Sequence, residues 1–339
     1  MPSESDTGSS DIIARREGRL GHLTLNRPKK LNSIGPSMAR EMDRVLDAWR
    51  TDERVEAVLI DSSSPRAFCA GGDIRHLSEV RESRGPETTA DEMSVAYGTM
   101  QRIAAFPKPV VTVMDGITMG GGIGLGAFGT VRVVTERSVL AMPEVMIGLT
   151  PDAGGSWLLA RAPGRHGLRL AMTGGRMHGA EAVTMGFADV FLPSEKLPEL
   201  AGMLADRVLA EVALLSRQDG PELAHDLEIA AVYADTDVEG IIRRLREADS
   251  DWMREDLKLL EEACPWSVGL SAWSWNRAKR YRSLPETIME ELKLVRACLR
   301  RPDFAEGVRA RVIDKDNAPR WSPADIGSAL AELRERGFS

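Results

Sequence analysis

Three glycine-rich segments constrain the fold of this chain more than any other feature. The first is 67–74 (AFCAGGDI), the second is 116–124 (GITMGGGIG), and the third lies within 142–155 (MPEVMIGLTPDAGG). The first follows a predicted buried strand at 55–60 (VEAVLI), and the second follows one at 109–115 (PVVTVMD). Each of these two segments therefore reads as a strand end that turns into a helix start.

The apolar pattern around these segments predicts alternating strands and helices. Residues 12–26 read as a β-hairpin with its turn near Gly18, and 131–135 (VRVVT) reads as a further strand. A helix beginning near Pro36 is indicated by the spacing of Met38, Met42, Val45 and Trp49. Strands and helices that alternate with long connections predict an α/β layered domain with crossover units.

The character of the chain changes after about residue 195. Further helices are predicted around 237–262 and 285–300, and we predict no strand beyond residue 195. One helical stripe is formed by Leu197, Leu200, Leu204, Val208, Val212 and Leu215. We therefore divide the chain into a lead-in at 1–11 that we expect to be disordered, an α/β core at 12–195, and a mainly helical C-terminal region at 196–339.

The glycine-rich turns suit chemistry at a carbonyl group. Glycine lets another atom approach the backbone closely, and the free N–H groups at a helix start favour negative charge. Two such turns side by side can direct two N–H donors at one oxygen, which is the arrangement of an oxyanion hole. The alternative is that these glycines only allow tight turns or close packing.

A dinucleotide-binding motif is a further alternative, because Gly124–Gly129 match the pattern GxGxxG. That motif must open a long helix, however. The predicted strand at 131–135 begins two residues after the motif and leaves no room for such a helix. The pattern is therefore better explained by packing than by nucleotide binding.

The three segments, taken in order with LNRP at 25–28 and LNS at 31–33, resemble the CoA-thioester motifs of the crotonase superfamily. Residues 303–321 (DFAEGVRARVIDKDNAPRW) resemble the C-terminal signature of 3-hydroxyisobutyryl-CoA hydrolases, although locally they also read as a salt-bridged helix end with a Trp anchor. The resemblance implies a spiral core of repeated ββα units and an acyl-CoA thioester hydrolase. Its substrate would be 3-hydroxyisobutyryl-CoA, cleaved to 3-hydroxyisobutyrate and CoA in valine catabolism.

The resemblance also implies particular site residues. The backbone N–H groups of Gly72 and Gly121 fall where the oxyanion hole of the family lies. Glu144 and Asp152 fall on positions used for catalysis and, like Glu79 and Gly121, on positions used for substrate binding. In this reading Glu144 attacks the thioester carbonyl or activates a water, and Asp152 binds the 3-hydroxyl or helps to protonate the CoA sulfur.

Each carboxylate also has a plainer reading. Glu144 can cap a helix, Asp152 can serve a turn or an N-cap, and Glu79 can be an ordinary surface residue. Two other functions compete with hydrolysis, namely an enoyl-CoA hydratase/isomerase and a CoA-binding protein without catalysis. The hydratase needs a second glutamate where this chain has Gly124, and a silent binder has no need of both Glu144 and Asp152.

Composition limits the partners and cofactors. A net charge of −7 argues against a basic nucleic-acid face, so CoA phosphates would meet local cations such as Arg27, Lys29, Lys30 or Arg75, unless these only form a solvated face. Three distant cysteines argue against disulfides, and five histidines without HxxxH or HExxH spacing argue against a metal site. Cys69 is expected to be a buried packing residue.

No apolar run of about 18 residues occurs, so no membrane span is predicted. The polar start MPSESDTGSSD has neither a signal-peptide core nor an Arg-rich transit pattern. We therefore expect a cytoplasmic enzyme that needs no cofactor, because CoA is part of its substrate. The resemblance adds the expectation of a homo-oligomer, a trimer or hexamer.

Overall fold

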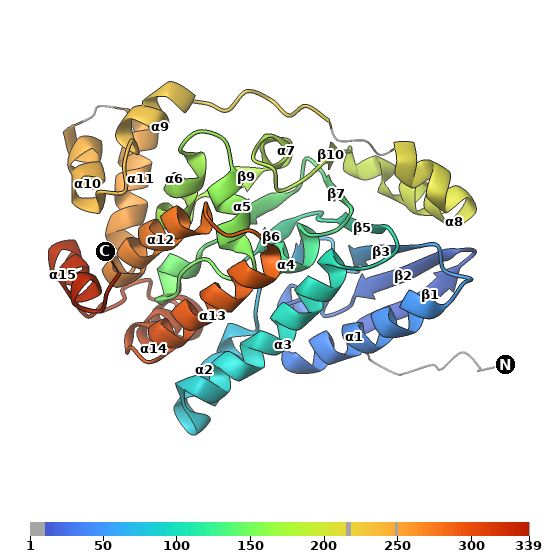
Figure 1. The fold of residues 1–339 in the computed structure, drawn as a ribbon, viewed down its shortest axis with the longest axis horizontal. Helices are drawn as coiled ribbons and strands as arrows, with labels where there is room; N and C mark the ends of the chain where they lie inside the picture. Colours follow the sequence, from blue (N-terminus) through green and yellow to red (C-terminus); the bar gives the residue numbers. More distant parts are fainter. Residues whose placement is uncertain (1–10, 215–217, 248–249, 339) are drawn as a thin grey trace.

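Two β-sheets frame the first part of the chain in the computed structural model, which describes residues 11–214, 218–247 and 250–338 (Figure 1). The predicted lead-in at 1–11 lies outside the described residues except for Asp11. The larger sheet has the order β1 (Ile12–Glu17), β2 (Leu20–Leu25), β3 (Ala57–Ser62), β5 (Val110–Val113), β7 (Val131–Val134) and β10 (Val190–Phe191). The smaller sheet has the order β4 (Ala67–Cys69), β6 (Ile117–Met119), β8 (Val139–Ala141) and β9 (Arg176–His178).

The strands are used in pairs that repeat along the chain. In each repeat the first strand (β3, β5 or β7) joins the larger sheet and the second (β4, β6 or β8) joins the smaller one. A helical segment follows each pair, namely α2 (Ile74–Arg84), α4 (Gly121–Gly126) and the 3-10 turn η2 (Glu144–Ile147). This succession confirms the predicted α/β fold of repeated ββα units.

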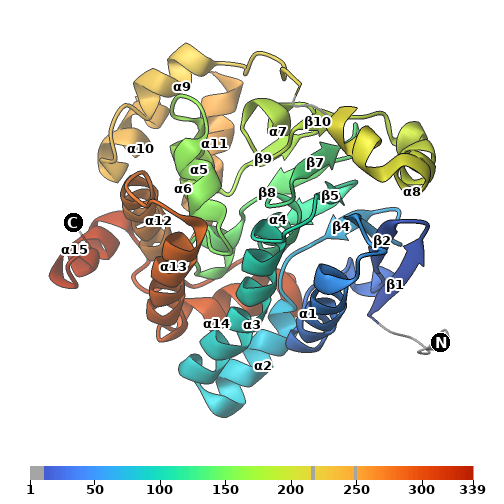
Figure 2. The same ribbon diagram turned by 45° about the vertical axis from the view of Figure 1, so that its right-hand side comes forward.

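The remaining helices cover these sheets and fill the second part of the chain (Figures 1 and 2). Those before residue 195 are α1 (Pro36–Thr51), α3 (Pro86–Ala104), α5 (Gly155–Arg161), α6 (His166–Thr173) and α7 (Glu181–Thr184). Those after it are α8 (Leu197–Leu214), α9 (Asp226–Val232), α10 (Val238–Glu247), α11 (Asp251–Glu262), α12 (Pro265–Ala278), α13 (Leu284–Leu299), α14 (Asp303–Val308) and α15 (Ile326–Glu335). In the described residues no strand follows Phe191, as predicted.

The predicted elements are found with two adjustments. The hairpin at 12–26 and the helix begun by Pro36 are confirmed, whereas the strand expected at 55–60 runs from Ala57 to Ser62. The single helical stretch expected at 237–262 is divided into α10 and α11. Of the stripe on α8, Leu200 and Leu204 are buried against the larger sheet, and Leu215 lies outside the described residues.

The buried apolar side chains extend across both parts of the chain. One cluster contains residues from Ile12 in the first strand to Leu333 in the last helix, so the C-terminal helices share a core with the ββα units. In particular, α13 packs on α3, and α14 packs on α2 (Figure 2). The boundary at 195/196 is thus a change in composition along the sequence, while the packing continues across it.

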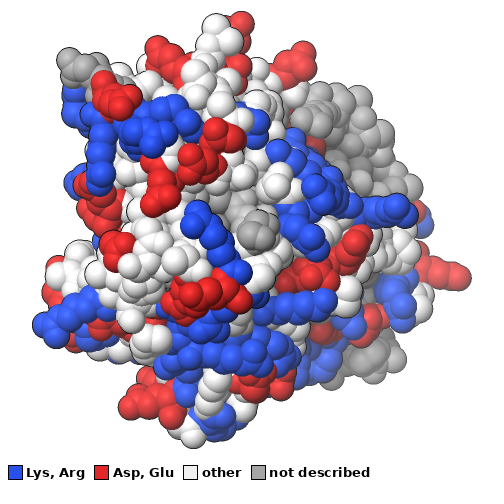
Figure 3. Space-filling model, turned by 60° about the vertical axis from the view of Figure 1, so that its left-hand side comes forward, with Lys and Arg blue, Asp and Glu red and all other residues white. Residues whose placement is uncertain are grey.

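The C-terminal signature segment has a structural explanation of its own. Arg309 bonds Glu306 at 2.8 Å, Asp314 at 2.7 Å and Asp316 at 2.6 Å. Trp321 donates its indole N–H to the Glu262 carbonyl at 3.1 Å, which anchors the segment to the end of α11. On the face drawn in Figure 3, basic and acidic side chains are interspersed in the same way.

Candidate active site

The smaller sheet brings the three glycine-rich segments to one place. Its strands β4, β6 and β8 are parallel neighbours, so their carboxyl ends lie at the same edge of the sheet. Ligands of α/β proteins bind at such edges. The residues that follow the three strands, among them Gly72, Gly121 and Glu144, line one shared pocket.

Two backbone N–H groups are available at this pocket. Gly71 has φ 103° and Gly120 has φ 51°, conformations that favour glycine, and these turns orient the peptides of Gly72 and Gly121. A Cβ placed on Gly121 would lie 3.5 Å from the Gly72 nitrogen, so the two turns are in contact. Within the described part of the chain, neither N–H donates to another backbone group. This geometry suits the stabilisation of an oxyanion.

Glu144 is a buried carboxylate beside these turns. The residue is 6% exposed, and a Cβ on Gly120 would lie 2.6 Å from its Oε1 atom, so any side chain at position 120 would displace this carboxylate. Its Oε2 atom has no hydrogen-bond partner among the described residues. Burial, followed by the nearby charge of Asp152, raises the pKa of Glu144 well above its ordinary value.

Asp152 lies in the same pocket and is also buried. Tyr97, from the middle of α3, donates its hydroxyl to Asp152 Oδ2 at 2.6 Å. Burial raises the pKa of Asp152 to about 6, while the bond from Tyr97 opposes that rise. Two neighbouring carboxyl groups in different surroundings can hold different protonation states at one pH, as acid–base chemistry requires. Sequence patterns gave no signal for Tyr97.

A third buried carboxylate, Glu291 of α13, reaches the loop that carries Asp152. It accepts hydrogen bonds from the backbone N–H of Gly154 at 2.7 Å and of Ser156 at 3.0 Å, and from the Ser156 hydroxyl at 2.5 Å. Burial raises the pKa of Glu291 to about 8. Its position 135 residues from Ser156 explains why no local motif could reveal it.

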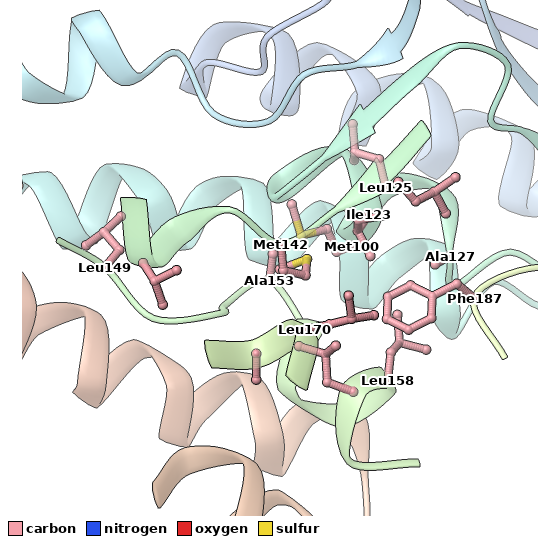
Figure 4. Close-up of a cluster of buried hydrophobic side chains, with 14 of the residues drawn as sticks. Met100, Ile123, Leu125, Ala127, Met142, Leu149, Ala153, Leu158, Leu170 and Phe187 are labelled. Atoms are coloured by element: carbon pink, nitrogen blue, oxygen red, sulfur yellow. The ribbon is translucent and has the colours of Figure 1, made fainter. Parts of the chain in front are cut away.

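The position that a hydratase glutamate would need is occupied by other atoms. A Cβ on Gly124 would overlap the sulfur of Met100 and would lie 2.8 Å from the Ala153 carbonyl oxygen. Met100 and Ala153 belong to a tightly packed apolar cluster that also contains Met142 (Figure 4). Position 124 therefore lacks the glutamate of a hydratase, and it also lacks the space for a glutamate side chain.

Glu79 is placed apart from the two buried carboxylates. It is exposed on α2 and lines an open groove that adjoins the pocket, and it is not among the residues that line the pocket itself. The helix turns the residue outward, because Leu77 and Val80 form its buried face. The pocket mouth instead carries His76, which bonds Glu92 at 2.7 Å, a pair that sequence reasoning missed.

The same groove contains three of the four cations proposed for CoA phosphates. Arg27, Lys30 and Arg75 line it, and Lys29 does not. Arg27 and Lys30 each lie 3.1 Å from Asp73, which also caps α2 by accepting from the His76 N–H. Asp73 therefore serves as the N-cap of α2 and as the partner of both cations.

Three further features of the described chain bear on the site. Cys69 is fully buried and burial raises its pKa to about 12, which confirms it as a packing residue. The segment 264–272 (CPWSVGLSA) forms the N-cap and the first half of buried α12, which packs on α5 and α6. Across the described residues, no group of three His, Cys, Asp or Glu side chains is arranged to hold a metal.

No helix of the described residues is both long and apolar enough to cross a membrane.

Known proteins resemble this chain over nearly its whole length. Residues 20–338 match the family model described as enoyl-CoA hydratase/isomerase. The 3-hydroxyisobutyryl-CoA hydrolase, mitochondrial, of Bos taurus is 35% identical over 350 residues, which is 98% of this chain and 89% of that protein.

Two solved structures are similar over nearly their whole length. An enoyl-CoA hydratase from Rhodobacter sphaeroides 2.4.1 has a TM-score of 0.89 and 39% identity, covering 96% of this chain and 97% of its own. A carnitinyl-CoA dehydratase from Mycobacterium thermoresistibile has a TM-score of 0.90 and 36% identity, covering 97% and 96%.

Proposed function

Because the chain belongs to the enoyl-CoA hydratase/isomerase family, we propose that it is an acyl-CoA thioester hydrolase that converts 3-hydroxyisobutyryl-CoA and water to 3-hydroxyisobutyrate and CoA, a step of valine catabolism. The observation that carries the proposal is the pair of buried carboxylates beside two free N–H groups, combined with a filled space at Gly124. The name of the Bos taurus relative supports the same activity.

The proposed reaction uses the pocket as follows. The thioester oxygen accepts hydrogen bonds from the N–H groups of Gly72 and Gly121, which stabilise the charge that develops on it. Glu144 either attacks the carbonyl carbon, giving an anhydride that water then hydrolyses, or removes a proton from an attacking water. In both routes the C–S bond breaks, one water is consumed, and the CoA sulfur leaves as the protonated thiol.

Asp152 is proposed to have a role separate from that of Glu144. Its carboxylate binds the 3-hydroxyl of the substrate or helps to protonate the departing sulfur. The open groove with Arg27, Lys30 and Arg75 is the proposed path of the CoA phosphates, and the exposed Glu79 lies along it. On this proposal Glu79 contacts the CoA portion of the substrate and leaves the acyl group to Asp152.

The remaining proposals concern the setting of the enzyme. We propose that it needs no cofactor beyond the CoA carried by its substrate, that it forms a trimer or hexamer, and that it is cytoplasmic, although the Bos taurus relative is named mitochondrial. Light scattering on the purified chain measures its mass, and fractionation of the source cells locates it.

Hydration of enoyl-CoA is the second candidate function, because the similar Rhodobacter sphaeroides structure is titled an enoyl-CoA hydratase. One experiment separates the two. Release of free CoA thiol from 3-hydroxyisobutyryl-CoA is measured in parallel with hydration of crotonyl-CoA, on the wild type and on Glu144→Ala. Thiol release that is lost in the variant supports the hydrolase. Hydration without thiol release contradicts it and favours the hydratase.

A further inference from the structure

Among the described residues, Glu291 forms its hydrogen bonds with one short turn. The residue is 1% exposed on the buried face of α13. Oε2 accepts from the Gly154 N–H, and Oε1 accepts from both the N–H and the hydroxyl of Ser156. Among the described residues it forms no ion pair with Lys, Arg or His, in contrast to buried Asp256, which pairs with Arg169.

A buried carboxylate without a cation is costly unless hydrogen bonds compensate for lost hydration. Glu291 has such bonds, but hydrophobic packing of α13 could be achieved by an apolar side chain at lower cost. Its presence is explained if the turn that it holds needs a rigid support.

The turn does need support, because its backbone is strained. Ala153 has φ 54° and Gly154 has φ 82°, so two successive residues directly after Asp152 are in the left-handed region. Such a conformation is unfavourable for alanine and persists only when surrounding contacts fix it. Within the turn, the Gly155 N–H donates to the Asp152 carbonyl at 2.6 Å, and on its far side the turn donates three hydrogen bonds to the Glu291 carboxylate.

Helix α13, which carries Glu291, is itself bonded to helix α3, which lines the pocket. Arg296, one turn further along α13, bonds Glu87 and Asp91 of α3 at 2.7 Å each. The same helix α3 carries Tyr97, which binds the Asp152 side chain. The backbone of Asp152 is thus held through α13 and its carboxylate through α3, and the two helices are packed together.

We infer that Glu291 is a positioning residue, which fixes the turn 152–156 so that the Asp152 carboxylate faces the acyl group of the substrate. This inference rests on the proposed hydrolase function and deepens it, since it assigns the selection of hydroxylated acyl groups to a residue of the C-terminal helical region. A site built to hydrogen-bond a substrate hydroxyl rejects an analogue without it by about 10⁴-fold to 10⁵-fold. Loss of Glu291 therefore lowers that discrimination.

The test compares three variants by their kcat and KM. Glu291→Gln keeps the shape but turns an NH₂ group toward one of the donors, and Ser156→Ala removes a single bond. Asp256→Asn is the matched control, because Asp256 is a fully buried carboxylate of α11 that accepts from Arg169 and Tyr233 and lies outside the pocket. Each is assayed with 3-hydroxyisobutyryl-CoA and with isobutyryl-CoA, which lacks the hydroxyl.

We expect Glu291→Gln to lower kcat for the hydroxylated substrate by about tenfold to a hundredfold, as small misplacements of a reacting group do. The preference for that substrate over isobutyryl-CoA falls with it, while Asp256→Asn keeps the wild-type preference. Ser156→Ala changes the preference in the same direction by a smaller factor. An unchanged preference in Glu291→Gln, or an equal loss in Asp256→Asn, overturns the inference.

A second variant and a second measurement test the inference even if Glu291→Gln fails to fold or substrate is not turned over. If Glu291→Gln does not fold, Ser156→Ala decides alone, and wild-type behaviour of that variant overturns the inference. Hydrogen exchange of the amides of Gly154 and Ser156 requires no substrate and is expected to accelerate in Glu291→Gln but not in Asp256→Asn. Equal exchange in the two variants contradicts a positioning role. A wild type without thiol release refutes the proposed function, whereas the exchange result still tests how the turn is held.

Discussion

At the scale of single residues, the buried position that the proposed chemistry gives to Glu144 lowers the stability of the folded protein. The folded protein raises its pKa well above the ordinary value, mainly through burial. Between the unfolded and folded pKa values, the folded state binds more protons than the unfolded state, so this carboxyl group lowers stability as the pH rises. A functional carboxylate that costs stability is a common feature of active sites.

Replacement of Glu144 by Gln is accordingly predicted to have opposite effects on stability and activity. Above neutral pH we expect Glu144→Gln to raise the melting temperature by about 2 °C or more, because the buried charge is removed. We also expect thiol release to fall by at least about a hundredfold, since Glu144 is the proposed base or nucleophile. Calorimetry at pH 8 and at pH 5 checks the first effect, which is smaller at pH 5. A lower melting temperature at pH 8 would contradict it.

The bond from Tyr97 to Asp152 predicts a change in the pH profile. The bond lowers the pKa of Asp152 from the level that burial alone would set. Hydrolysis by an ionised carboxylate is expected to increase with pH as the Glu144–Asp152 pair loses protons. Without the Tyr97 hydroxyl the pKa of Asp152 rises, so Tyr97→Phe is predicted to move the acidic limb of kcat/KM to higher pH.

The measurement is kcat/KM between pH 5 and pH 9. Tyr233→Phe is the matched control, because buried Tyr233 donates to Asp256 at 2.7 Å outside the pocket. The control is expected to keep the wild-type profile. An acidic limb in Tyr97→Phe at the wild-type position would mean that Asp152 does not titrate in the step that is measured.

At the scale of elements, the packing of α3 against α4 determines which side chains the site can contain. Met100 of α3 and the Ala153 carbonyl occupy the space beside Gly124 of α4. We predict that Gly124→Glu does not create a hydratase and destabilises the protein by about 3 kcal/mol or more, since overpacking alone costs about 1–3 kcal/mol and a buried charge adds to it. Urea denaturation and crotonyl-CoA hydration check both statements.

Gly98→Ala supplies the control for that experiment. Gly98 lies two residues from Met100 on α3, and nothing stands within 4 Å of a Cβ added there. Alanine is favoured over glycine in a helix by about 1 kcal/mol, so Gly98→Ala is expected to stabilise the chain. If Gly124→Glu were as stable as the wild type, the space beside Gly124 would not be closed in solution.

The sequence predicted correctly those elements that have a clear local pattern of apolar residues. The hairpin at 12–26 and the helix from Pro36 have clear periodicity, and both are confirmed. Strands β4, β6, β8 and β9 contain only three residues each, which is too short for an alternating pattern, and they were missed. The contacts of Tyr97 and Glu291 join positions 55 to 137 residues apart, and only the folded chain reveals them.

For the proposed site residues, the motifs were informative about backbone positions. Gly72, Gly121 and Glu144 line one pocket because they follow neighbouring strands of the smaller sheet, whereas in the sequence only the resemblance of their motifs to the crotonase motifs had brought them together. Glu79 was harder to place, because a helix residue can face the pocket or the solvent, and the phase of α2 depends on which residues it buries.

At the scale of the whole molecule, the shared core predicts that the two parts of the chain depend on each other. A chain ending at Arg282 lacks α13, α14 and α15, and it exposes the side chains of the first part that pack against them. We predict that this shortened chain aggregates or unfolds below the melting temperature of the full chain, which gives a single transition. Calorimetry and size-exclusion chromatography measure this. A soluble shortened chain with the full melting temperature would indicate two independent units.

The bond between Glu291 and the turn after Asp152 also has a consequence in time. A ribosome makes Ser156 long before Glu291, because 135 residues separate them. At about 5–20 residues per second, roughly 7 to 27 s pass between the two. During that interval the growing chain contains Glu144 and Asp152 but lacks the anchor for its strained turn. On the proposed role of Glu291, competence to act on a thioester is thus acquired late in translation, when the chain is nearly complete.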